Sequence, residues 1–117
     1  MKYNPDDTIV FFGMGKLLEK CYSNMCGVLG RKPDFFYDND RSKWGQVFAG
    51  IRCLSQDELI ALPENSKIIF STRLAEKIHW QVLGRRFDSV HAFIFERSES
   101  SIKGIYDITR TAVEREN

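Results

Sequence analysis

Four short apolar runs divide the chain, and none shows the polar alternation of a half-exposed strand. They lie at residues 8–12, 34–38, 67–71 and 90–95 and are rich in β-branched and aromatic side chains. Runs of this kind are typical of strands that are buried on both faces, as in a parallel sheet. A shorter run at 51–54 is a fifth candidate strand.

Apolar positions at helical spacing separate these runs. After the first run we expect a helix that ends at Gly27 or Gly30, because a glycine easily takes a left-handed terminal conformation. The apolar stripe of this helix consists of Leu17, Leu18, Cys21, Tyr22 and Met25. Ser55 and Glu58 form a capping-box pattern, which predicts a short helix that Pro63 stops.

Two further helices are expected, one from about residue 73 to Gly84 and a final amphipathic one at about 102–115. Strands that alternate with helices indicate an α/β fold with a sheet covered on both faces. We predict a three-layer Rossmann-like fold with a parallel sheet of four or five strands. It forms a single domain over residues 1–117, with its core at about 8–95.

Composition and charge exclude several classes of partner. Of the 117 residues, 43% are hydrophobic and 28% are charged, and the formal net charge is +1. This balance provides no strong field for nucleic acid, and no apolar run approaches the roughly 18 residues that cross a bilayer. The N-terminal segment lacks an apolar signal region, and the chain has three cysteines. We therefore expect a cytoplasmic protein that binds neither nucleic acid nor membrane.

The turn after the first strand carries the sharpest chemical signal. Gly13-Met14-Gly15 lies between a predicted strand and a predicted helix, and Lys16 falls in the first helical turn. Glycines in such a turn let the backbone approach a phosphate, and unpaired N–H groups at the helix start favour an anion. The alternative is an ordinary tight turn. Leu18 stands where the dinucleotide pattern has glycine or alanine. The pattern therefore supports a generic nucleotide as ligand better than it supports NAD(P).

Polar residues after two other predicted strands are the remaining candidate ligand contacts. Asp38 follows Gly15 near the spacing, about 20 residues, at which a carboxylate holds ribose hydroxyls. We expect ribose or sugar contacts from this segment, which contains Asp38, Asn39 and Asp40. The alternative is turn chemistry, because Asp and Asn side chains also start loops.

Ser71 and Thr72 come at the carboxyl end of a central predicted strand, where ligands bind in open α/β sheets. Their hydroxyls are candidates for contact with a base or a phosphate, and the alternative is an N-cap for the next helix. Trp44 either stacks on a base or plugs the end of the sheet.

Three segments, taken together, resemble a known module. They read FFGMGK, DFFYDNDRSKWGQVFAGIRCLSQDEL and KIIFST. Over residues 8–95 the chain is similar to the small N-terminal nucleotide-binding domain of bacterial sugar O- and N-acyltransferases. It is also similar to segments attached to polysaccharide-biosynthesis epimerases and some methyltransferases. The positions that carry the resemblance are Asp38, Asn39, Asp40, Lys43, Trp44, Gly45, Gly50, Ile51, Ser55 and Leu59.

This resemblance implies a holder for the nucleotide part of a UDP-sugar. In the acyltransferases, acetyl-CoA and the catalytic histidine belong to a separate left-handed β-helix, and this chain has no hexapeptide repeats. The resemblance therefore implies that the chain binds the nucleotide but does not carry out acyl transfer. We expect the chain to form a homodimer or to associate with a larger partner that carries a catalytic domain. Met14 and Leu18 depart from the small residues of the family and leave the pose of the diphosphate open.

Three functions follow from these patterns. The first is a nucleotide or nucleotide-sugar binding domain linked to bacterial surface-polysaccharide or sugar metabolism. The second is an NAD(P)- or S-adenosylmethionine-binding fragment of an oxidoreductase or methyltransferase. The third is a protein-interaction domain with a vestigial pocket. No set of nucleophile, base and orienting residue and no metal motif emerges, so we do not expect a complete enzyme.

Overall fold

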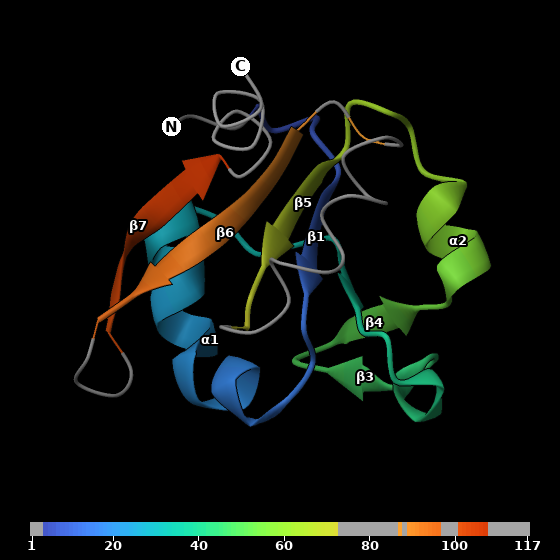
Figure 1. Cartoon of the computed structure of the whole chain (residues 1–117), viewed down its shortest axis with the longest axis horizontal. Helices are drawn as coiled ribbons and strands as arrows, with labels where there is room; N and C mark the ends of the chain where they lie inside the picture. The colour runs from blue at the N-terminus through green and yellow to red at the C-terminus, as the bar shows by residue number, and fades with distance from the viewer. Residues whose placement is uncertain (1–3, 73–86, 88, 97–100, 108–117) are drawn as a thin grey trace, which may run out of the picture.

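A mostly parallel sheet forms the centre of the computed structural model (Figure 1), which describes residues 4–72, 87, 89–96 and 101–107. Within these residues seven strands form one sheet, in the order β3-β4-β2-β1-β5-β6-β7. Their bounds are β1 Ile9–Phe12, β2 Phe35–Tyr37, β3 Val47–Phe48, β4 Ile51–Leu54, β5 Lys67–Phe70, β6 Ser89–Phe95 and β7 Ile102–Asp107. The helices are α1 Lys16–Leu29, the 3-10 turn η1 Arg41–Lys43, and α2 Gln56–Ile60.

The five strands β4, β2, β1, β5 and β6 are parallel to one another. Counted along the chain they take the order 3-2-1-4-5, which is the order of a Rossmann sheet. The expected α/β Rossmann-like fold is thus confirmed. Two antiparallel strands extend the sheet beyond that expectation, β3 beside β4 and β7 beside β6.

Burial on both faces explains the apolar runs. Every residue of β1 is at most 3% exposed. Ile9 and Phe11 face the cluster that contains Leu18 and Met25 of α1, whereas Val10 and Phe12 face the opposite cluster. Leu59 of α2 belongs to that second cluster, so α1 and α2 cover opposite faces of the sheet (Figure 1). A strand in this position has no solvent face on which to place polar residues.

Local capping signals fix two helix ends. The helix α1 ends at Leu29 and is capped by Gly30, one of the two expected positions, whose N–H donates to the carbonyl of Cys26 at 2.8 Å. The expected capping box of α2 is present, with both Ser55–Glu58 hydrogen bonds. Arg52 also pairs with Glu58 at 2.6 Å. This pairing and the bond from the Ser55 N–H lower the pKa of Glu58 to about 2.

The C-terminal segment differs from the expected helix, because Ile102–Asp107 forms the strand β7 against β6. The ladder slips by one residue at Ile94/Phe95, so Ile102 pairs with Phe95 and Ile105 pairs with Phe93. This bulge brings Ile102 and Ile105 to one face, where both pack against the α1 cluster. Their helix-like spacing is therefore satisfied within a strand. Residues 108–117, and the helix expected at 73–84, lie outside the described part of the chain.

Candidate functional site

The carboxyl ends of β1, β2 and β5 meet at one edge of the sheet. The strand β1 has β2 on one side and β5 on the other, so this edge is the topological switch point at which open α/β sheets bind ligands. Ser71, just after β5, donates its buried hydroxyl to the carbonyl of Gly13 at 2.7 Å. The Gly13 N–H in turn donates to the carbonyl of Tyr37 at 2.7 Å. The loop after β1 is thereby tied to both neighbouring strands.

Gly13 occupies a backbone conformation and a space that only glycine suits. Its φ is +125°, a value that side chains disfavour. A Cβ at this position would lie 3.1 Å from Ser71 Oγ and 3.1 Å from Thr72 Cγ2. Gly13, Ser71 and Thr72 therefore form a packed support beneath the loop, and the hydroxyl of Ser71 is already engaged there.

Gly15 faces a much more open environment. It is the N-cap of α1, with an extended backbone, and no side chain caps the helix within the described residues. A Cβ at Gly15 would have one described neighbour within 4 Å, the Lys43 Nζ at 3.8 Å. Lys16 is exposed at the first helical position. Glycine thus leaves the start of a 14-residue helix without a side chain over its N–H groups, and phosphate binding there stays a prediction.

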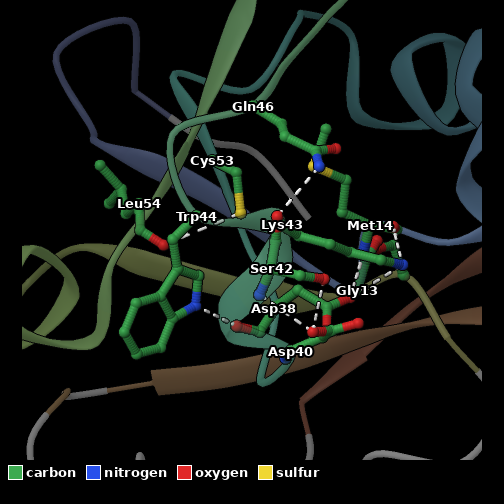
Figure 2. A network of polar contacts seen from close by, with 11 residues as sticks. Gly13, Met14, Asp38, Asp40, Ser42, Lys43, Trp44, Gln46, Cys53 and Leu54 are labelled. Carbon is green, nitrogen blue, oxygen red and sulfur yellow. Dashed lines mark hydrogen bonds and ion pairs between the residues drawn. The ribbon is translucent and has the colours of Figure 1, made fainter.

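Asp38 is the hub of the polar network in Figure 2. One carboxylate oxygen accepts the Met14 N–H at 2.8 Å, and the other accepts the Asp40 N–H at 2.8 Å. Its main-chain carbonyl accepts the Trp44 Nε1–H at 2.7 Å. The carboxylate thus points toward Gly13-Met14-Gly15, the turn after β1, which we call the glycine loop. Its hydrogen bonds link the segment after β2 to this loop. The bond from the Asp40 N–H agrees with the turn alternative, whereas the bond from the Met14 N–H was not predicted. Contact of Asp38 with ribose stays a prediction.

The Asp38→Asn variant tests this structural role. An amide retains one acceptor oxygen but places an NH₂ group against the second backbone N–H. We expect a loss of about 1–2 kcal/mol in the free energy of unfolding without any ligand, measured by urea denaturation. Asp6→Asn makes the same charge change in an exposed turn and should have little effect. Equal stability of the two variants would contradict a supporting role for Asp38.

Asp40 and Asn39 lie on the exposed side of this loop. Asp40 caps η1, because one oxygen of its carboxylate accepts the Ser42 N–H at 3.0 Å and the Ser42 hydroxyl at 2.7 Å. These two bonds lower the pKa of Asp40. The capping agrees with the turn alternative, and a sugar contact by Asp40 or Asn39 stays a prediction.

Lys43 is a site residue to which the sequence assigned no ligand role. Because Asp40 fixes the turn η1, the Lys43 side chain reaches across to the glycine loop (Figure 2). Its Nζ donates to the carbonyl of Met14 at 2.5 Å and lies 3.9 Å from the Asp38 carboxylate. In the sequence, Lys43 is marked only by its position three residues after Asp40. That spacing points to the site only once Asp40 is known to cap the turn η1.

Trp44 packs at the end of the sheet. Its half-buried ring stacks on Tyr37, with centroids 6.3 Å apart and planes inclined by 29°. The Arg41 guanidinium lies 5.8 Å from the centroid of the same ring. The indole contacts both core clusters, which matches the plugging alternative. Stacking of Trp44 on a base stays a prediction.

Burial shifts the pKa of two side chains of types that often take part in catalysis, Cys53 and His91. Burial raises the pKa of the Cys53 thiol to about 11. Burial also lowers the pKa of His91, although Asp107 lies 3.7 Å from its Nε2. The described residues include no group of three or more His, Cys, Asp or Glu suited to a metal ion. They also include no helix long and apolar enough to span a membrane.

Comparison with known proteins supports the fold. No protein-family model matches the chain, and no curated protein matches it. A solved structure of UDP-D-quinovosamine 4-dehydrogenase from Vibrio fischeri is similar, with a TM-score of 0.67 and 18% sequence identity. The match covers 86% of this chain and 92% of that one. At this identity the similarity establishes a shared Rossmann-like fold, and the resemblance to acyltransferases gains no support from it.

Proposed function

We propose that the chain binds a nucleotide at the carboxyl edge of β1, β2 and β5, and that its ligand is the nucleotide part of a UDP-type sugar. The observation that carries this proposal is the open surface of Gly15 before the uncapped start of α1. Backbone N–H groups and the helix dipole at such a position favour phosphate.

The contacts within the loop support two candidates for the phosphate donors. The Met14 N–H is already used by Asp38, whereas the N–H groups of Gly15 and Lys16 have no acceptor within the described residues. Gly15 and Lys16 are therefore the proposed phosphate donors, and Gly13 and Met14 shape the loop that presents them. The ribose or sugar would lie toward Asp38, Asn39 and Asp40, with Trp44 beside them. Ser71 and Thr72 would support the loop from beneath, since the Ser71 hydroxyl is buried and bonded to Gly13.

A nucleotide sugar is favoured over NAD(P) by the packing of Leu18. This side chain is fully buried against the cluster that contains Phe11, at the position where the dinucleotide pattern has a small residue. A larger residue there keeps the start of α1 further from β1. The solved structure of similar fold carries a UDP-sugar in its name, which adds support for uridine ligands.

We further propose a cytoplasmic role in bacterial surface-polysaccharide or sugar metabolism. In this proposal the chain holds the nucleotide, and a partner or a second copy of the chain contributes to the reaction.

A thermal-shift screen tests the proposed function directly. The ligands are UDP, UDP-N-acetylglucosamine, NAD, NADP, S-adenosylmethionine and acetyl-CoA. A ligand at about 100 times its dissociation constant adds about 2.7 kcal/mol to stability. We expect stabilisation by the two uridine compounds. Stabilisation by NAD(P) or S-adenosylmethionine alone would favour an enzyme fragment, and no response to any ligand would favour an interaction domain with a vestigial pocket.

A further inference from the structure

The Lys43 ammonium is held above the glycine loop by a turn that belongs to a different segment. The turn η1 is capped by Asp40, and the Lys43 Nζ bonds to the carbonyl of Met14. The Lys43 side chain is 29% exposed, so its charge is partly shielded from water and salt. A cation in this place acts on the loop more strongly than a freely moving surface lysine does.

The charge of Lys43 is directed at the same surface as the helix start. An ammonium has three N–H donors, and the carbonyl of Met14 takes one of them. The Asp38 carboxylate, at 3.9 Å, is an ion-pair partner beyond hydrogen-bonding distance. The point where a Gly15 Cβ would stand lies 3.8 Å from Nζ. A group that rests on Gly15 therefore meets the Lys43 ammonium as well as the first turn of α1.

We propose that Lys43 makes this site select a nucleoside diphosphate over a monophosphate, an inference that rests on the proposed function. One phosphate is accommodated by the N–H groups at the start of α1. A second phosphate adds negative charge beside the Asp38 carboxylate, which already bonds to the loop through the Met14 N–H. Lys43 supplies the cation that offsets this repulsion, through a charge-assisted hydrogen bond to the second phosphate.

The test compares the affinities of UDP and UMP by calorimetry for the wild-type chain and for Lys43→Met. Wild type is expected to bind UDP more tightly than UMP. In Lys43→Met, UDP affinity should fall by about tenfold or more, while UMP affinity changes by about threefold at most. The preference for UDP is thereby largely lost. Pyrophosphate and phosphate serve as base-free probes and should show the same pattern.

Lys32→Met is the matched control, because it removes one positive charge from an exposed position before β2, at the opposite end of that strand from the loop. It should leave the UDP preference unchanged. An unchanged preference in Lys43→Met, or equal losses for UDP and UMP, would overturn the selectivity role while leaving nucleotide binding in place. A wild-type chain that binds neither the nucleotides nor the base-free probes would overturn the proposed function together with this inference.

Discussion

Replacing Gly15 by valine is expected to abolish nucleotide binding and to leave the fold stable. Gly15 has a φ of −124°, which a side chain accepts, and its Cβ position has only Lys43 Nζ nearby among the described residues. The valine methyl groups would stand on the surface where the phosphate is proposed to rest. Loss of two charge-assisted hydrogen bonds should weaken binding by about a hundredfold or more, as measured by calorimetry.

Gly27→Val is the matched control for this variant. Gly27 lies within α1, and nothing in the described residues approaches its Cβ position within 4 Å. The same substitution there should leave both affinity and stability close to wild type. Unchanged affinity in Gly15→Val would remove the phosphate-loop assignment. A large loss of stability in Gly15→Val would show instead that the loop needs glycine for folding.

The sequence predicted the central elements well because their signals are local. The fully buried β1 left an apolar run without alternation, and Ser55 and Glu58 marked the start of α2 within four residues. Each of these features depends on neighbours close in the chain. The parallel direction of these strands, though not their order, then followed from the alternation of strands and helices.

The edge strands could not be predicted in the same way. The strand β7 depends on its pairing with β6, and the bulge at Ile94/Phe95 gives its apolar residues a helix-like spacing. The hairpin of β3 and β4 turns at Ala49 and Gly50, which both have positive φ. Asn-Gly is the usual sequence of such a turn, and here alanine stands in place of the asparagine. The edge strands β7 and β3 were therefore missed, the first because it depends on long-range pairing and the second because its turn has an unusual sequence.

The sequence predicted that the candidate residues lie together at the ends of the strands, but it did not predict most of the hydrogen bonds between them. Strand ends placed Gly13, Asp38 and Ser71 at one edge, as the topology requires. The direction of the Asp38 carboxylate depends on where two backbone N–H groups lie in space. The reach of Lys43 depends likewise on the turn that Asp40 caps. The Asp38–Asp40 bond is a local turn contact, but the contacts of Asp38 and Lys43 with Met14 are not encoded in the spacing of residues along the chain.

Gly13→Ala is expected to destabilise the fold strongly, by about 3 kcal/mol in urea denaturation without ligand. The loss has two sources, the positive φ of +125° and the lack of space for a methyl group against Ser71 and Thr72. The buried bond from the Ser71 hydroxyl to the carbonyl of Gly13 prevents easy separation of the two segments. Movement of either segment would break that bond or open the core beneath it.

Gly45→Ala separates these two sources. Gly45 has a φ of +84°, and nothing lies within 4 Å of its Cβ position in the described residues. It therefore reports backbone strain alone, about 1 kcal/mol. The difference between the two variants then reports the packing of Gly13 against Ser71 and Thr72, together with the added strain of its larger φ. Equal losses would mean that Ser71 and Thr72 yield readily, and the loop would then be a poor support for a phosphate, because its position would not be fixed before the ligand arrives.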